Sequence, residues 1–290
     1  MQETADAAAT TTTRTAVGHR FRIEGSPEVV EAAEEIFSTL PAVAPGGDEP
    51  ELTFHATVRP EGVRVVVADE MTTMSDLGGA LDYVQWHLNR LVVAGLGPAQ
   101  TALHAACAVR DGHLVLLPAA SGGGKSTTVA GLVRAGWAYV TDEASILDAA
   151  TLEVQPYPKP ISIDHGAWPL FPELADRLRS DETCLVPATR LQAASSTSSL
   201  ATSAVATGGP VAAVVAPSYH PGVATELQPL TPGALLMLLA QSTFAFNEDG
   251  PRHLRCLAEL TRRSVGYRLV IGDLDQAVAL LDGVVDELPS

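Results

Sequence analysis

Three consecutive glycines, followed directly by a lysine and a serine, are the residues of this chain whose types and spacing best suit chemistry. Backbone N–H groups converge on phosphate oxygens only where the chain adopts glycine conformations and lets a ligand approach closely. A lysine after such a turn can contact the β- and γ-phosphates of a nucleotide, and the next hydroxyl can contact the Mg²⁺ that bridges them. Gly122, Gly123, Gly124, Lys125 and Ser126 therefore predict a turn that binds a nucleoside triphosphate.

The sequence on both sides of this turn fits a phosphate-binding role. An apolar run from His113 to Pro118 predicts a buried strand before the turn, and the run from Lys125 to Ala135 predicts a helix after it. The usual pattern begins with glycine, where this chain has Ala119. A glycine-rich turn with an exposed lysine and no ligand stays open as the alternative. The residues predicted to contact the nucleotide are Ser121, Gly122, Gly123, Gly124, Lys125, Ser126 and Thr127.

Two carboxylates and a histidine are predicted to lie close to the turn. Asp142 and Glu143 follow a predicted strand from Trp137 to Val140, and His104 begins the predicted strand that pairs with the strand before the turn. A carboxylate pair at a strand end can place one group on Mg²⁺ and the other on an acceptor hydroxyl as a base. Both features have structural alternatives, a solvated turn for the carboxylates and a core position for the histidine.

The same segments resemble the catalytic domain of HPr kinase/phosphorylase and its relatives. The resemblance is carried by Leu103-His104-Ala105-Ala106, Ala120-Ser121-Gly122-Gly123-Gly124-Lys125-Ser126, Thr141-Asp142-Glu143 and Tyr157-Pro158-Lys159-Pro160. It covers residues 101–164 with specific motifs and the remainder weakly. The resemblance implies a P-loop α/β core related to phosphoenolpyruvate carboxykinase and the phosphorylation of a serine hydroxyl. The relatives include kinases that modify precursor peptides in lasso-peptide biosynthesis.

The resemblance also implies roles by position. His104 matches the family's active-site histidine and Asp142 its catalytic carboxylate. Glu143 stands where the family has a second aspartate, which keeps the charge and lengthens the side chain. Residues 20–100 do not resemble the regulatory domain of the bifunctional enzyme, so the resemblance implies the kinase chemistry without the sugar-regulation role.

The expected elements, taken with the resemblance, predict an α/β fold class: a P-loop core of the HPr kinase and phosphoenolpyruvate carboxykinase type with a small α+β N-terminal domain. Residues 1–19, mostly Ala and Thr, are expected to be a disordered tail. Residues 20–100 are expected to fold as the α+β domain, from a strand, a helix, a hairpin and a second helix. Residues 101–290 are expected to form the P-loop kinase domain, with residues 195–209 as a Ser-, Thr- and Ala-rich loop.

Composition excludes several classes of protein. The 290 residues include 34 acidic and 18 basic side chains, for a net charge of −16, so we expect neither nucleic acid nor a membrane surface as partner. No apolar run approaches the ~20 residues that span a bilayer, and no secretory signal is evident, so we expect a cytoplasmic protein. Cys107, Cys184 and Cys256 lie far apart without metal-ligand spacing and are expected to be reduced structural thiols.

One lysine and one cluster of basic residues each have two interpretations. Lys159, between two prolines, could direct its ammonium at a phosphate or an acidic substrate, or be a surface lysine. Arg252, His253 and Arg255 form a basic cluster near the start of a predicted helix. The cluster could contact a γ-phosphate or a peptide, or form a solvated helix face.

The sequence therefore predicts an ATP- and Mg²⁺-dependent kinase that transfers the γ-phosphate to a hydroxyl, with a serine of a peptide or small protein as the expected acceptor. Lys125 and the amides of the turn would hold the triphosphate, Ser126 and Glu143 the metal, and Asp142 with His104 would orient and deprotonate the acceptor. A small-molecule hydroxyl kinase and a non-catalytic ATP-binding regulator are the alternatives. The oligomeric state stays open, a homo-oligomer included.

Overall fold

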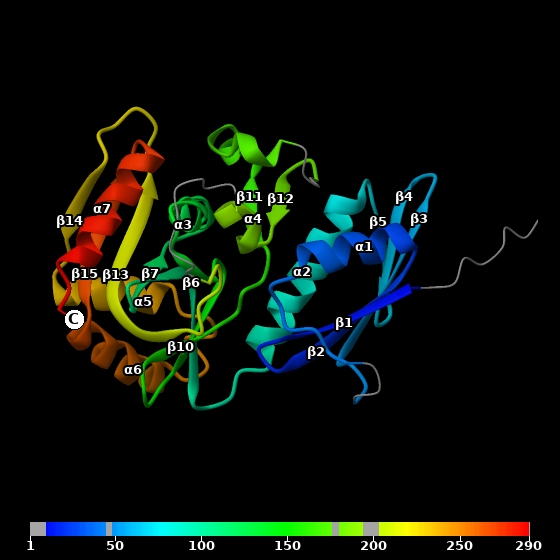
Figure 1. Ribbon diagram of the computed structural model, residues 1–290. Coiled ribbons are helices and arrows are strands. Elements are labelled where there is room, and N and C mark those ends of the chain that lie inside the picture. Colours follow the sequence, from blue (N-terminus) through cyan, green and yellow to red (C-terminus); the bar gives the residue numbers. More distant parts are fainter. Residues whose placement is uncertain (1–9, 45–47, 176–179, 194–202, 290) are drawn as a thin grey trace, which may run out of the picture. The chain divides into compact units, whose positions relative to one another are not determined.

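The computed structural model describes residues 10–44, 48–175, 180–193 and 203–289, which form a mixed α/β protein with three sheets (Figure 1). The chain divides into two compact units. The first consists of Met1–Val92 and Ser162–Pro187, and the second of Val93–Ile161 and Ala188–Ser290. The sequence predicted one boundary near residue 100, whereas the chain enters the first unit a second time after residue 161.

The first unit is built on a five-stranded sheet in the order β1-β2-β3-β4-β5. Strands β2 and β3 run parallel, and the other neighbours run antiparallel. Helix α1 (Pro27–Ile36) begins with a proline, and helix α2 (Leu77–Ala94) turns Leu81, Val84 and Leu88 into the core at helical spacing. The strands are β1 (Thr10–Ala16), β2 (His19–Gly25), β3 (Leu52–Arg59), β4 (Gly62–Val67) and β5 (Glu70–Met74).

Strand β1 contradicts the disordered tail predicted for residues 1–19. Thr10–Ala16 pairs along its whole length with β2, and Ala16 is fully buried. The composition was misleading because threonine supplies little apolar surface yet favours a strand once a neighbour offers a ladder of hydrogen bonds. Residues 1–9 lie outside the described part of the chain.

The second segment of the first unit was not predicted. It contains a two-stranded sheet of β11 (Ile161–Asp164) and β12 (Thr183–Val186), with the short 3-10 helices η1 (His165–Leu170) and η2 (Pro172–Leu174) between them. Gln85 on α2 donates a 2.7 Å hydrogen bond to the Ser162 hydroxyl. Segments far apart in sequence are therefore joined by a polar contact within this unit.

The second unit contains an eight-stranded sheet in the order β10-β9-β6-β7-β13-β15-β14, with β8 paired to β6. Strands β7, β13 and β15 run parallel. The link between β6 and β7 has φ values of 51° at Asp111 and 82° at Gly112, as a type I′ turn requires. The strands are β6 (Gln100–Arg110), β7 (His113–Pro118), β8 (Ala138–Thr141), β9 (Ala144–Asp148), β10 (Glu153–Gln155), β13 (Gly209–Tyr219), β14 (Glu226–Pro229) and β15 (Val265–Ile271).

Two groups of helices cover this sheet. Helices α5 (Pro232–Gln241) and α6 (Gly250–Arg263) pack against each other and share a core with Leu114 and Leu116 of β7. Helix α3 (Lys125–Arg134) packs with α4 (Ala188–Ala193) and α7 (Leu274–Asp286). Because side chains alternate along a strand, Val115 and Leu117 of β7 face the side of α3, opposite to α5 and α6.

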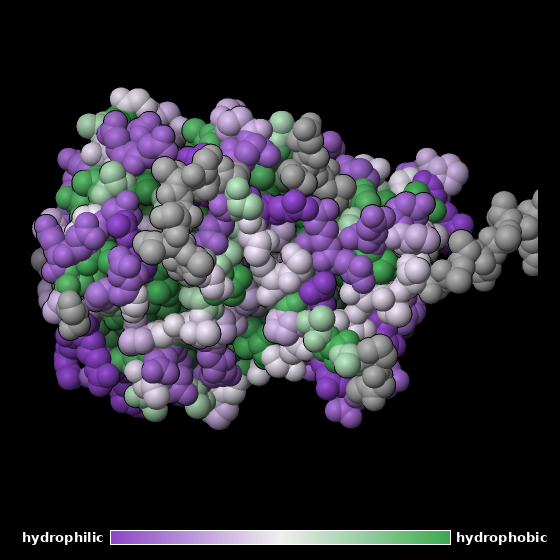
Figure 2. Space-filling model, in the orientation of Figure 1, coloured by the Kyte–Doolittle hydropathy of each residue, from purple (hydrophilic) through white to green (hydrophobic). Residues whose placement is uncertain are grey.

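The surface mixes hydrophobic and hydrophilic residues, and the cysteines lie in the interior. On the face shown in Figure 2, hydrophobic residues are exposed in small groups among hydrophilic ones. None of the described helices is long and apolar enough to cross a membrane. All three cysteines are free and buried, and burial raises the pKa of the Cys107 thiol to about 12, as expected for structural thiols. Residues 195–202 of the predicted 195–209 loop lie outside the described residues, and Gly209 already belongs to β13.

Strand pairing brings the predicted site residues to one edge of the second unit's sheet. Ala105 on β6 pairs with Pro118 at the end of β7, so His104 lies level with the start of the glycine-rich turn. His104 also pairs with Ala144 at the beginning of β9. The two-residue link between β8 and β9, Asp142 and Glu143, is therefore next to His104.

Candidate active site

The glycine-rich turn joins β7 to α3 with two left-handed residues. Gly122 has a φ of 76°, and Gly124, the residue preceding α3, has φ and ψ of 92° and 12°. Among the described residues, the non-glycine positions with positive φ are Val17, Ala68, Asp111, Leu152 and Ala245. Ala119 is not one of them, so its position in the turn does not need glycine. The departure from the usual pattern thus places no strain on the backbone there.

Gly123 is required by packing rather than by its φ. A Cβ atom at this position would lie 2.8 Å from the Ala119 Cβ and 3.1 Å from the Ala120 carbonyl oxygen. Both atoms belong to the turn itself, so a side chain at Gly123 would force the turn open. Ser121 is exposed in the turn, and Ser126 and Thr127 lie in the first turn of α3, where backbone N–H groups have no partner within the helix.

Gly123→Ala is expected to weaken Mg-ATP binding by about five- to a hundredfold, because overpacking of this kind costs about 1–3 kcal/mol. Isothermal titration calorimetry would measure it. Gly283→Ala in α7, where a Cβ meets nothing within 4 Å, is the matched control and should leave binding unchanged. The double variant Ala119→Gly/Gly123→Ala should recover part of the affinity, since it removes the closest clash; no recovery would contradict this packing explanation.

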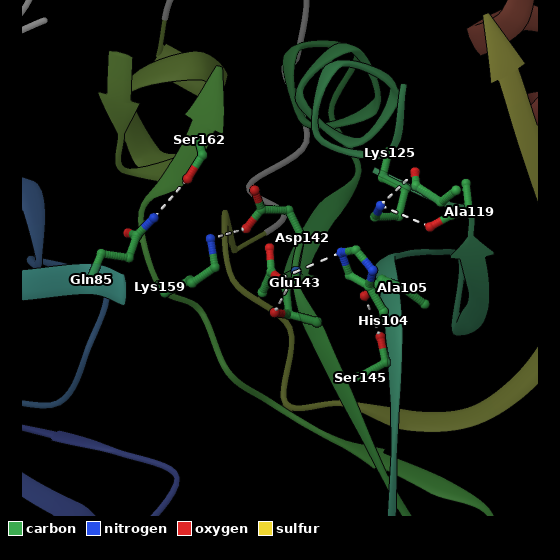
Figure 3. A network of polar contacts seen from close by, with 12 residues as sticks. Gln85, His104, Ala105, Ala119, Lys125, Asp142, Glu143, Ser145, Lys159 and Ser162 are labelled. Atoms are coloured by element: carbon green, nitrogen blue, oxygen red, sulfur yellow. Dashed lines mark hydrogen bonds and ion pairs between the residues drawn. The ribbon is translucent and has the colours of Figure 1, made fainter. Parts of the chain in front are cut away.

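Lys125 lies inside the turn. Its side chain is almost fully buried, and its Nζ donates to the carbonyl oxygens of Ala119 at 2.9 Å and Ala120 at 3.1 Å. A positive charge is thus held among the backbone groups of the turn (Figure 3). This is where a phosphate group bound by the N–H groups of α3 would need a cation.

His104 and Glu143 form the accessible pair of the site. The His104 Nε2 lies 3.5 Å from the Glu143 Oε1, and about a third of each side chain is exposed. Burial lowers the pKa of His104, and the nearby Lys125 ammonium lowers it further, against the opposing effects of Glu143 and Asp142. The imidazole is therefore neutral at pH 7 and able to accept a proton.

Asp142 is buried and points toward Lys159 (Figure 3). Its side chain has no exposed surface, and its Oδ1 lies 2.5 Å from the Lys159 Nζ and accepts a 2.8 Å hydrogen bond from the Tyr139 hydroxyl. Burial first, and then the Asp142 charge, raise the pKa of Tyr139, so the phenol stays protonated as the donor. The predicted direct contact between Asp142 and an acceptor does not fit this orientation.

Lys159 is the residue whose role the sequence did not reveal. The surface alternative is wrong: its side chain is 1% exposed, pairs with Asp142, and donates a further hydrogen bond to the Pro160 carbonyl at 3.1 Å. The flanking prolines were the available signal, because they fix the backbone that carries the ammonium inward.

Two of the three residues of the basic cluster on α6, Arg252 and His253, belong to the scaffold, whereas Arg255 is exposed. Arg252 pairs with Asp249 and donates to the carbonyl oxygens of Pro98 and Gln100, and the buried His253 contacts the Thr101 hydroxyl at 3.1 Å. These contacts tie α6 to the start of β6. A γ-phosphate contact is therefore not needed to explain Arg252 and His253.

Within the residues that the structure describes, no three His, Cys, Asp or Glu side chains are grouped as a site for a metal ion. A magnesium ion bound with a nucleotide needs few protein ligands, because phosphates and waters complete its shell. The Ser126 hydroxyl and the Glu143 carboxylate are oxygen donors of the kind that Mg²⁺ prefers, so the predicted pair fits that role.

No protein-family model matches the sequence, and the comparison with curated proteins gives no match. The resemblance to HPr kinase/phosphorylase therefore stays a prediction from the motifs.

Proposed function

We propose that this protein is an ATP- and Mg²⁺-dependent kinase with a P-loop core of the HPr kinase type, which transfers the γ-phosphate to a hydroxyl. One observation carries the proposal: the cation in the glycine-rich turn and the accessible His104–Glu143 pair belong to one electrostatic site. Ala105, next to His104, pairs with Pro118 directly before the turn, and the Lys125 ammonium is held inside that turn. The glycine-rich turn and the His104 imidazole thus lie together at one edge of the sheet, which supports joint action on a phosphate group.

In this proposal, the N–H groups of the turn and Lys125 bind the triphosphate, while Ser126 and Glu143 hold the metal, which would offset the negative charge of the phosphates. The acceptor oxygen forms a bond to the γ-phosphorus as the bond to the β,γ-bridging oxygen breaks, leaving ADP. The acceptor proton passes to the neutral His104 imidazole. A serine of a peptide or small protein as acceptor rests on the motif resemblance.

Asp142 acts in this proposal as a positioning residue. Its buried pair with Lys159 fixes the link between β8 and β9, from which the neighbouring Glu143 projects toward His104. This role differs from the direct base predicted by position, because the carboxylate has no exposed surface and is paired with Lys159.

The test is transfer from [γ-³²P]ATP. With Mg²⁺ and a library of serine- and threonine-containing peptides, the wild-type protein should label an acceptor, and even without one it should slowly hydrolyse ATP. If Mg-ATP binds but neither hydrolysis nor transfer occurs under any condition, kinase activity is excluded.

A non-catalytic ATP-binding regulator is the second candidate, and one observation favours it. Asp142, which aligns with the family's catalytic carboxylate, is buried and paired with Lys159. A regulator of this kind would show stabilisation by Mg-ATP, with no transfer in a single-turnover experiment.

The pH dependence of turnover should report on His104. The pKa of His104 lies below the ordinary 6.5, so the imidazole is neutral at pH 7. Activity should fall only when the pH drops below 6.5 and the imidazole becomes protonated. His104→Gln should reduce the rate by about 10²-fold and remove this acid limb. Initial rates of ATP hydrolysis between pH 4.5 and 8 would measure both effects, at saturating Mg-ATP; an unchanged limb in the variant would rule out His104 as the proton acceptor.

A further inference from the structure

The side of the glycine-rich turn away from His104 is lined by the end of β13. The Pro217 carbonyl oxygen lies 3.5 Å from where a Cβ of Gly123 would be, and the Tyr219 Cβ lies 3.7 Å from where a Cβ of Gly124 would be. Figure 1 shows β13 between β7 and β15, in agreement with the strand order. The turn therefore has His104 and Glu143 on one flank and Tyr219 on the other.

Tyr219 presents an aromatic side chain that is 54% exposed. Side chains alternate along β13, so Tyr219 and Pro217 lie on the α3 side, whereas Ser218 and His220 lie on the other side and contact each other at 2.8 Å. Tyr219 is therefore exposed beside the glycine-rich turn, and its ring does not fill the interior of this unit.

The backbone beneath Tyr219 is held firmly. The N–H of His220 donates to the Ile271 carbonyl at 2.9 Å, continuing the pairing of β13 with β15. The loop that follows is fixed by the Thr225 hydroxyl, which accepts hydrogen bonds from the N–H groups of Gly272 at 3.1 Å and Asp273 at 2.9 Å. The tyrosine is thus placed by the sheet rather than by a loose loop.

We infer that Tyr219 is the surface on which the nucleobase stacks, an inference that rests on the proposed function. A nucleoside triphosphate carries its γ-phosphate and its base at opposite ends. If the γ-phosphate faces His104 and Glu143 on the β6 and β9 side, the base extends across the turn toward β13, where Tyr219 lies. Stacking uses the π-face that every base has, so this site takes adenine and guanine nucleotides alike.

The experiment compares Mg-ATP, Mg-GTP and Mg-tripolyphosphate, which has the phosphates but no base, by calorimetry on the full chain. Tyr219→Ala should weaken the binding of both nucleotides by about five- to a hundredfold. It should leave the binding of tripolyphosphate unchanged, and Tyr219→Phe should bind all three ligands as the wild type does. Leu254→Ala, which removes another exposed apolar side chain on α6 at the opposite face, is the control and should change nothing.

The outcomes separate this inference from the proposed function. If the wild type binds Mg-ATP and Tyr219→Ala binds it equally well, the stacking site is wrong while the phosphate-binding turn stands. Equal weakening of all three ligands would mean that Tyr219 supports the turn and not the base, and would also overturn the inference. If the wild type binds neither a nucleotide nor tripolyphosphate, both fail together.

Discussion

Lys125→Met is expected to abolish detectable Mg-ATP binding while leaving the fold intact. Each charge-assisted hydrogen bond contributes about 1.5–3 kcal/mol, so losing contacts to two phosphates weakens binding by at least about a hundredfold. Methionine keeps an unbranched side chain of similar length in the nearly buried position. The lost bonds to the Ala119 and Ala120 carbonyls affect only the turn.

The measurement is the rise in the thermal unfolding midpoint caused by saturating Mg-ATP, checked by calorimetry. A ligand that binds only the folded state stabilises it by an amount that grows with its affinity, so the shift should disappear in Lys125→Met. Arg134→Ala, which removes another basic side chain from α3 and its 3.1 Å ion pair with Asp275, is the matched control and should retain the shift. A full shift in Lys125→Met would end the nucleotide assignment.

Asp142→Asn should strongly destabilise the fold. It leaves the Lys159 ammonium buried opposite a neutral amide, and breaking a buried ion pair from one side costs about 3–5 kcal/mol. The asparagine oxygen can still accept the Tyr139 hydrogen bond, so the change isolates the charge. Lys159→Met should cost a similar amount, because it strands the Asp142 carboxylate.

Urea unfolding of the single variants and of Asp142→Asn/Lys159→Met forms the test. The double variant should be more stable than either single variant, since no charge is then left buried without its partner. If the losses of unfolding free energy in the two single variants simply add in the double variant, the two side chains do not act as a pair. If Asp142→Asn kept wild-type stability and lost only transfer, Asp142 would instead be the base that the sequence predicted.

The elements that carry the turn could be predicted because their signals are local. The apolar run before the glycines is β7, and the segment after them is α3, which ends one residue before the predicted end. The direction of a side chain just after a strand end is not local. Asp142 turns inward because Lys159, 17 positions further along the chain, arrives beside it, and sequence spacing gave no sign of that meeting.

Two other features escaped prediction for related reasons. Tyr219 is placed beside Gly124 by the parallel pairing of β13 with β7, and the register between strands so far apart cannot be read from either one. The segment 162–187 contains short elements whose membership in the first unit depends on contacts such as that between Gln85 and Ser162.

The interrupted course of the chain through its two units means that the first unit is completed late in synthesis. The first unit ends at Pro187. Its last residues are therefore synthesised later than the glycine-rich turn, Lys125 and the link that contains Asp142. Neither unit is a continuous piece of polypeptide, so a truncation at residue 98 would strand residues 162–187 without the α2 side chain that Ser162 contacts. A fragment limited to the second unit would therefore have to be made by removing both segments and joining residue 161 to residue 188.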